Sequence, residues 1–391
     1  MGIAALSLFG CSQKKTITDD SAWLRNGIET AQFQLKMTAE AIDSKNIQDT
    51  AVFPRSILNP KPMAEKNPQN WIDSLRLEKP RDWTSGFFPG SMWLAYELTG
   101  DDTLKQEARK YTELLSDLQY YTGTHDLGFM VFCSFGNAYR LAPEAGDSAI
   151  IVNASKSLAS RYNPQKGVIR SWDFGEWTYP VIIDNMMNLE MLFWASQATQ
   201  DSTFRNIAIT HADNTMKFHY RPDMSCCHVV DYIDPTNDIT KQMTYQGYSD
   251  SSTWARGQAW GLYGYTLCFE ETNHSAYLER AQQIAKFIME NPAIPEDLIP
   301  YWDYNAPTIP DAPRDASAAA VTASALFELS TLVENGQTYF DYAEKIIKEL
   351  STPNYLAEKG TNNGFILKHS TGSLPHGSEI DVPLNYADYY Y

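Results

Sequence analysis

The segment at residues 179–194 decides how the rest of the chain is interpreted; it reads Tyr-Pro-Val-Ile-Ile-Asp-Asn-Met-Met-Asn-Leu-Glu-Met-Leu-Phe-Trp. Its residues are apolar on nearly every side, a pattern typical of a helix that is buried all round. Pro180 suits a helix start, where no amide partner is lost, so we expect Asp184 in the first turn, at the positive end of the helix. A carboxylate at that position either caps the helix or takes part in chemistry.

The same pattern returns along the chain as an apolar helix, a short polar turn and an amphipathic helix. We interpret the apolar helix of each copy as an inner helix and the amphipathic one as an outer helix. The copies recur at roughly 45 to 70 residues, which predicts a repeat architecture. The five copies are 90–98 with 103–118, 128–141 with 147–162, 184–198 with 201–219, 257–271 with 275–291, and 316–334 with 338–350.

A sixth copy can be assembled from the two ends, with residues 384–391 as the inner helix and 22–42 as the outer one. Six helical hairpins that close on themselves make an all-α (α/α)6 toroid, which we predict as a single domain over residues 21–391. An open helical solenoid would not need both ends to complete one unit. A mixed α/β fold is disfavoured because alternating, strand-like runs are nearly absent.

Composition limits the partners. The formal net charge of -17 argues against a nucleic-acid partner, and nothing in the sequence implies a protein partner. An anionic ligand would have to be captured by a few local cations. The cysteines offer neither a disulfide ladder nor ligand-spaced pairs for zinc. The sequence also shows no nucleotide-binding loop and no metal-ligand cluster, so we expect no metal and no cofactor.

The first ten residues are uncharged and mostly apolar or small, and they lead to Cys11 and a polar run. This resembles a bacterial lipoprotein signal with Cys11 as the lipidated residue, although no Lys or Arg precedes the apolar run. We therefore expect residues 1–20 to be an export signal and polar linker. The protein would then be exported, periplasmic or anchored to a membrane through a lipid on Cys11.

In a toroid, the loops that enter the inner helices converge at one end of the axis, so their polar residues should share one pocket. Nearly all of these segments pair a carboxylate or arginine with an aromatic residue or glycine. Sugar-processing sites need this mixture of stacking rings, carboxylates that hold hydroxyls or move protons, and glycines. The segments are 81–90, 124–129, 179–184, 245–260, 313–317 and 378–383.

These segments resemble the unsaturated glucuronyl hydrolases, glycoside hydrolase family 88, from about Trp83 to the last residue. The motifs that carry the resemblance are Asp-Trp-Thr-Ser-Gly-Phe-Phe-Pro-Gly, His-Asp-Leu-Gly-Phe, Ile-Ile-Asp-Asn-Met-Met-Asn-Leu, Gln-Gly-Tyr-Ser-Asp-Ser-Ser-Thr-Trp-Ala-Arg-Gly-Gln-Ala-Trp and Arg-Asp-Ala-Ser-Ala-Ala-Ala. The family has an (α/α)6 barrel, which agrees with the repeat pattern.

The resemblance implies hydration of the C4=C5 double bond in the Δ4,5-unsaturated uronic acid that polysaccharide lyases leave on glycosaminoglycan-type oligosaccharides. It implies that Asp184 protonates C4 and then activates water for attack at C5, with Asp126 as its catalytic partner. Two carboxylates in one enclosed pocket raise the proton affinity of at least one of them, whereas a helix N-terminus lowers it. The substrate-binding residues implied by the resemblance are Trp83, His125, Trp172, His228, Gln246, Trp254, Arg256 and Trp260.

Several of these residues also have purely structural interpretations. His228 could be a buried structural histidine, and Arg256 could serve packing or capping, although a planar cation suits a uronate carboxylate. For Arg314 we favour a structural pair with Asp315 over a substrate role.

Two positions depart from the family pattern. Tyr245 stands where many members have His, which affects a hydrogen bond near the water site. The segment 370–375, Ser-Thr-Gly-Ser-Leu-Pro, lacks the Lys of members that favour 6-sulfated substrates, so strong dependence on that sulfate is not expected.

Two alternatives remain open from the sequence. One is an unsaturated rhamnogalacturonyl hydrolase of family 105, which acts on pectin fragments. The other is a surface lipoprotein that binds glycans without catalysis, for which a buried pair of aspartates would not be expected.

Overall fold

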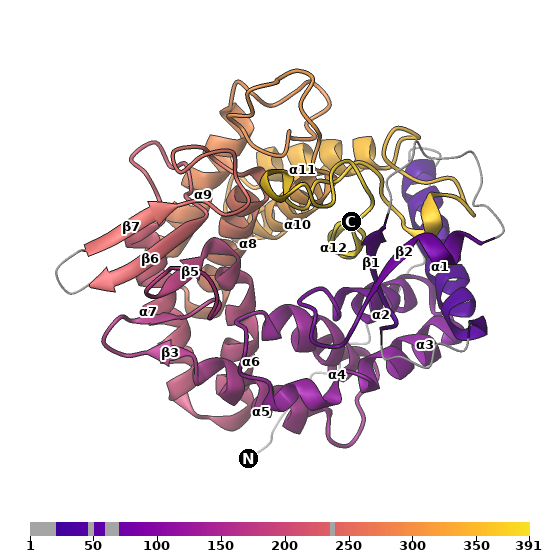
Figure 1. Ribbon diagram of the computed structural model, residues 1–391, viewed down its shortest axis with the longest axis horizontal. Helices are drawn as coiled ribbons and strands as arrows, with labels where there is room; N and C mark the ends of the chain where they lie inside the picture. The colour runs from indigo at the N-terminus through magenta and orange to yellow at the C-terminus, as the bar shows by residue number, and fades with distance from the viewer. Residues whose placement is uncertain (1–20, 46–50, 59–69, 235–238) are drawn as a thin grey trace, which may run out of the picture.

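A computed structural model describes residues 21–45, 51–58, 70–234 and 239–391 of the chain (Figure 1). The predicted export signal with Cys11 lies outside these residues. The helices are arranged as a ring of hairpins around a central axis, as Figure 1 shows. The prediction of an all-α toroid is therefore confirmed.

Each hairpin joins an inner and an outer helix. The five consecutive pairs are α2 (Phe87–Thr99) with α3 (Asp102–Glu113), η4 and α4 (Gly128–Gly136, Asn137–Leu141) with α5 (Asp147–Ala159), η5 and α6 (Ile183–Asn188, Leu189–Thr199) with α7 (Ser202–Phe218), α8 (Ala255–Thr272) with α9 (Ser275–Glu290), and α10 (Ala316–Leu332) with α11 (Gln337–Leu350). Short 3-10 turns lie at Trp71–Ser74, Ser116–Tyr120, Asn362–Gly364 and Leu374–His376.

The two ends of the described chain close the ring, as predicted. Helix α12 (Asn385–Tyr390) packs between α10 and α2, and α1 (Ala22–Ser44) packs against α2 and α3. On its other side, α1 meets α11, because Lys348 lies over the ring of Trp23. The hydroxyl of Tyr391 lies so close to Gly27 that a Cβ atom there would collide with it.

The short polar turns predicted inside the hairpins contain residues that end one helix and cap the next. Gly100 ends α2 in the left-handed conformation, with φ of 69°, which glycine adopts without strain. The Asp101 carboxylate then accepts a hydrogen bond from the Thr103 amide at 2.9 Å and caps α3. Asp201 caps α7 in the same way through Thr203.

Strands are more numerous than the sequence indicated. In the described part of the chain, three small antiparallel sheets lie on the ring: β1 with β2, β3 with β4, and β5 with β6 and β7. The strand bounds are Phe53–Ile57, Leu75–Glu78, Tyr162–Asn163, Val168–Ile169, Pro180–Ile182, Val229–Asp234 and Ile239–Met243. Strands β1 and β2 pair with each other ahead of the first hairpin.

The start of the segment at 179–194 was also predicted incorrectly. Pro180 begins strand β5 and faces Asp231 of β6, so it does not start a helix. The helix begins at Ile183 and its first six residues are 3-10, which leaves Asp184 in the first turn but ahead of the α-helical part. The segment is buried as expected, because the strand and the helix both face the interior.

No helix within the described ranges is long and apolar enough to cross a membrane.

Candidate active site

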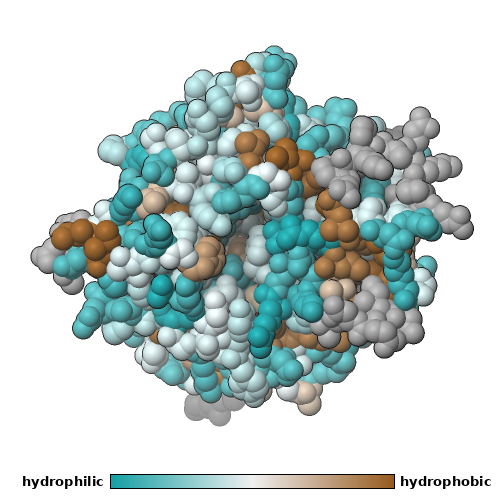
Figure 2. Space-filling model, in the orientation of Figure 1, coloured by the Kyte–Doolittle hydropathy of each residue, from teal (hydrophilic) through white to brown (hydrophobic). Residues whose placement is uncertain are grey.

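A cavity of about 540 Å³ lies where the loops that enter the inner helices converge. Its wall contains Asp126 and Asp184, two acids that are 58 residues apart in the chain and sit on neighbouring hairpins. Figure 2 shows a depression near the middle of this face, rimmed largely by hydrophilic residues. We call this space the front cavity.

Asp184 is the buried acid of the front cavity, with 6% of its surface exposed. Strand β5 carries the chain to it, and the 3-10 turn that follows directs the side chain inward. Burial raises the pKa of Asp184 to about 7; nearby Asp126 adds to the rise, while Arg256, the backbone and Trp260 oppose it. Such a carboxyl group holds a proton near neutral pH and can still release it.

Asp126 is held in a defined orientation at the cavity wall. The Thr124 hydroxyl donates to Asp126 Oδ2 at 2.5 Å, and His125 Nε2 lies 3.2 Å from Oδ1. Burial lowers the pKa of His125, so its imidazole is neutral near pH 7. Asp126 is more exposed than Asp184, and the two acids therefore have different environments.

Two polar side chains tie the segments of the two acids together. The backbone carbonyl of Ser171 accepts a hydrogen bond from the His125 amide at 3.2 Å, and the Ser171 hydroxyl accepts one from the Ile182 amide at 2.9 Å. Asn188 Oδ1 accepts the amide of Phe129 at 3.0 Å. Gly128 permits this contact, because a Cβ atom there would lie 2.6 Å from the Cα of Asn188. The spacing of the acids is therefore fixed by buried bonds rather than by a flexible loop.

His228 lies beside Asp184, with 3.7 Å between its Nε2 and Asp184 Oδ2. Its Nδ1 accepts the amides of Tyr245 and Gln246, each at 3.1 Å, so the ring proton must be on Nε2. Burial lowers the pKa of His228 well below its ordinary value. A neutral imidazole therefore directs an N–H group toward the Asp184 carboxyl group.

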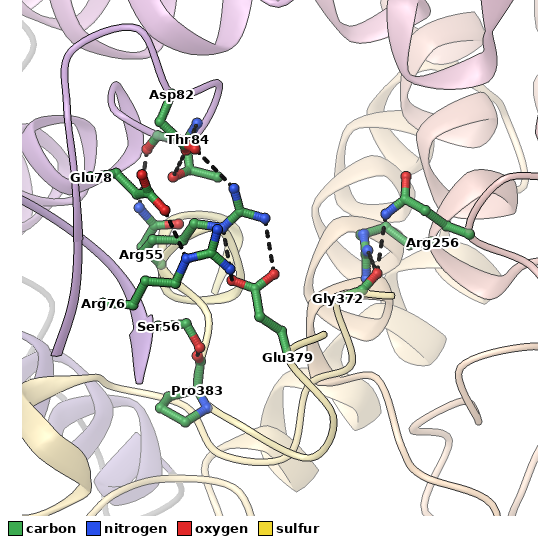
Figure 3. Close-up of polar contacts among 12 residues, drawn as sticks. Arg55, Ser56, Arg76, Glu78, Asp82, Thr84, Arg256, Gly372, Glu379 and Pro383 are labelled. Atoms are coloured by element: carbon green, nitrogen blue, oxygen red, sulfur yellow. Dashed lines mark hydrogen bonds and ion pairs between the residues drawn. The ribbon is translucent and has the colours of Figure 1, made fainter. Parts of the chain in front are cut away.

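Arg256 is buried behind the wall, and both terminal nitrogens of its guanidinium are hydrogen-bonded. Its guanidinium donates to Asp315 at 2.6 Å and to the carbonyls of Thr371 and Gly372 at 2.7 Å each; Figure 3 shows the bond to Gly372. It also lies 4.4 Å from the centre of the Trp254 ring. The prediction that Arg314 pairs with Asp315 was wrong: Asp315 is taken by Arg256.

Arg314 instead pairs with the carboxylate of Asp297, to which it donates a hydrogen bond at 2.8 Å. Its guanidinium also lies over the ring of Tyr301. These contacts fit the structural role that was expected of Arg314, although the partner differs.

Of the ten residues predicted for the site, six line the front cavity: Trp83, His125, Asp126, Trp172, Asp184 and Gln246. The other four, His228, Trp254, Arg256 and Trp260, are at most 3% exposed and lie behind the wall. His228 and Trp254 pack ring to ring at 4.6 Å, and Trp260 packs against Phe129 at 5.3 Å. His228, Arg256 and Trp260 support Asp184 from behind, whereas Trp254 packs on His228 and Arg256. Direct contact with a sugar stays a prediction for all four.

Sequence reasoning missed several wall residues. Arg55 binds Glu379 through two nitrogens at 2.7 and 2.9 Å and Asp82 at 2.9 Å, as Figure 3 shows. Arg81 and Tyr386 also line the cavity. Arg81, Asp82 and Glu379 lie in the loops that were singled out before the inner helices, whereas Arg55 comes from β1, for which no sequence signal was recognised.

Comparisons with known proteins identify the family of the chain. No protein-family model matches the chain. An unsaturated glucuronyl hydrolase of Formosa agariphila is 48% identical over 314 residues, which cover 80% of this chain and 78% of the relative. An unsaturated chondroitin disaccharide hydrolase of Streptococcus pyogenes is 34% identical and covers 79% of each chain.

Among solved structures, an unsaturated glucuronyl hydrolase specific for heparin superposes with a TM-score of 0.88, with 48% identity over 95% of both chains. The unsaturated glucuronyl hydrolase of Bacillus sp. GL1 superposes with a TM-score of 0.80 at 27% identity, over 93% of this chain and 94% of that one. The chain therefore belongs to the unsaturated glucuronyl hydrolases of glycoside hydrolase family 88.

Proposed function

We propose that the front cavity hydrates the C4=C5 double bond of a Δ4,5-unsaturated uronic acid at the non-reducing end of lyase-generated heparin-type disaccharides. The observation that carries the proposal is Asp184: a buried carboxyl group with a pKa raised to about 7, facing a cavity that also holds Asp126. Heparin is favoured because the relative that is 48% identical over 95% of the chain is specific for heparin.

Asp184 supplies the proton in the first step. Its O–H proton passes to C4, and positive charge develops at C5 and the ring oxygen. The Asp184 carboxylate that remains is stabilised by the neutral N–H group of His228 and by the positive charge of Arg256 behind it.

The second step adds water at C5. The water oxygen bonds to C5 while the Asp184 carboxylate accepts a proton from the water. This proton transfer restores the acid for the next turnover. The C5 hemiketal opens to a ketone, and the hemiacetal left at C1 releases the next sugar. Asp126 orients the ring hydroxyls, and the hydrogen bond from Thr124 and the 3.2 Å contact with His125 hold it in place for this role.

The wall aromatics supply the apolar faces that a sugar ring needs. Trp83 and Trp172 both line the cavity, and Trp172 stacks on Phe174 with ring centres 5.0 Å apart. Gln246 donates to the Gly372 carbonyl at 3.1 Å and keeps its amide oxygen available for a hydroxyl of the substrate.

The purified protein is mixed with unsaturated disaccharides from heparin, chondroitin and pectin digests, and loss of the ultraviolet absorbance of the double bond is followed. We expect the fastest loss with the heparin disaccharide. Faster turnover of the pectin product would contradict the proposed heparin-type substrate. Binding without loss of absorbance would show a glycan-binding protein.

We also propose that the protein is exported as a lipoprotein. The support is the apolar run that leads to Cys11 and the polar residues that follow it. Cell fractionation of the parent and a Cys11→Ser variant tests this, and a variant that stays in the membrane fraction like the parent would exclude lipid attachment at Cys11.

A further inference from the structure

We propose that Arg81 binds a sulfate group on the sugar that follows the unsaturated residue, and so selects sulfated substrates. The proposal rests on the proposed function. Arg81 lies in the loop that enters α2, lines the front cavity and is exposed to solvent.

The charge balance of the wall singles out Arg81. Five acidic residues line the cavity: Asp82, Asp126, Asp173, Asp184 and Glu379. Arg55 pairs with Asp82 and Glu379, and Arg76 pairs with Glu379 as well. Asp173 pairs with Arg161 at 2.9 Å and with Arg170 at 3.2 Å. Among the wall residues that the structure describes, Arg81 is the cation for which no acidic partner is found.

The guanidinium of Arg81 is presented on a fixed support. It lies 5.0 Å from the centre of the Tyr121 ring, and that ring folds back over Gly123, where a Cβ atom would lie 2.6 Å from the tyrosine oxygen. A guanidinium that stacks on an aromatic face keeps the N–H groups at its edge free for a planar or tetrahedral oxyanion.

The loop beneath Arg81 is also rigid. Asp82, the next residue, accepts the amide and the hydroxyl of Thr84 at 2.9 and 2.6 Å and the guanidinium of Arg55. The amide of Asp82 donates to the Lys79 carbonyl at 2.9 Å. The position of Arg81 is therefore set before a ligand arrives, which lowers the entropic cost of binding.

Substrate chemistry decides which anion reaches Arg81. The uronate carboxylate is attached to C5, the carbon that water attacks, so it must lie as deep as the buried Asp184. The second sugar extends from that ring toward solvent, where the exposed Arg81 lies. An oxyanion at that depth is a substituent of the second sugar, and in heparin-type disaccharides that substituent is a sulfate on nitrogen or on O6.

The test uses the full-length protein and three heparin disaccharides that differ only in the second sugar: unsulfated, N-sulfated and 6-O-sulfated. For Arg81→Gln we expect kcat/KM to fall about 10- to 100-fold on at least one sulfated disaccharide, mainly through KM, and less than about 3-fold on the unsulfated one. Arg81→Lys should recover part of the loss, because it keeps the charge and loses the planar fork.

Arg140→Gln is the matched control, since Arg140 is an exposed arginine that pairs with Glu97 and does not line the front cavity. It should leave all three substrates unchanged. Increasing salt should narrow the gap between parent and Arg81→Gln on the sulfated substrate.

Equal losses on all three disaccharides would overturn the proposal and assign Arg81 to the uronate or to loop structure. No loss on any of them, or a parent that rejects both sulfated disaccharides, would also overturn it. A parent that is inactive on the unsulfated disaccharide as well would instead contradict the proposed function.

Discussion

Among the described residues, three acids have a pKa raised to about 7: Asp184, Glu190 and Asp388. Two of them, Asp184 and Glu190, face different cavities. Asp184 faces the front cavity; Glu190, six residues later, faces a second cavity of about 460 Å³ lined by later turns of the inner helices. We call the second space the rear cavity. Burial is the main cause for both acids, so a raised pKa alone does not identify the catalytic group.

The neighbours of the two acids differ. Asp184 has a second carboxylate in its cavity, a buried guanidinium and the imidazole of His228, so charge of either sign can be stabilised there. Around Glu190 the other acids, Glu271, Glu270 and Glu328, only raise its pKa further, and the opposing cation Arg140 is already paired with Glu97. An acid that must lose and regain a proton needs the first kind of environment.

The largest expected effect separates the two acids directly. Asp184→Asn removes the transferable proton, and we expect kcat to fall about 10³-fold or more. Glu190→Gln has the same chemical character and should leave kcat within about 2-fold, since Glu190 does not line the front cavity. Initial rates on the preferred disaccharide measure both, and comparable losses in the two variants would remove the distinction.

The next effect concerns the bonds that set the spacing of the acids. Asn188→Ala frees the Phe129 amide and loosens the link between the Asp126 and Asp184 segments, so we expect kcat to fall about 10- to 100-fold. Asn137→Ala is the control, because Asn137 donates to Cys133 and Tyr389 beside the rear cavity. If both variants lose the same stability and the same activity, the link has no special role.

The dependence of rate on pH tests the front cavity alone. Asp184 works in its protonated form, so kcat/KM should fall as pH rises through about 7, by roughly tenfold per unit above that point. A profile from about pH 4 to about pH 9 shows the midpoint. Glu190→Gln should keep the same midpoint; a rate that stays flat up to the alkaline end would exclude Asp184 as the acid.

The smallest effect is on stability. The folded protein raises the pKa of Glu190 from 4.5 to about 7, so the folded state binds more protons than the unfolded state between these values. Its stabilising contribution is present below pH 4.5 and is lost as pH rises through about 7.

Glu190→Gln cannot ionise, so it avoids the loss of stability that ionised Glu190 causes. We expect its free energy of unfolding to be higher than that of the parent by on the order of 2 kcal/mol at about pH 8, with little change near pH 4. Urea unfolding at the two pH values measures the difference. An equal gain at both would point to packing instead of titration.

Much of the ring could be predicted because its signals are local. The inner helices are apolar, the outer ones are amphipathic, and Gly100 with Asp101 shows where one ends and the next begins. Strand β5 was missed because Pro180 also suits a helix start, and only pairing with β6, which is distant in sequence, shows that it is extended.

The site was predicted in outline and not in depth. The acids could be found because they precede inner helices. The residues that position the acids, such as Ser171 and Asn188, could not be predicted, because each makes a hydrogen bond to a segment that is distant in the sequence. Arg256 was expected at the substrate, but its partners Thr371 and Gly372 are more than 110 residues later and hold it behind the wall.

Closure of the ring by α12 has a consequence for biosynthesis. Tyr386 belongs to α12; it lines the front cavity, and its ring lies 5.0 Å from the ring of Trp83. Helix α12 packs between α10 and α2, and α2 precedes it in the chain by more than 280 residues. A nascent chain that has not yet produced α12 has an open circle with one wall missing. Hydrolytic competence should therefore emerge abruptly at the end of folding, and not accumulate hairpin by hairpin.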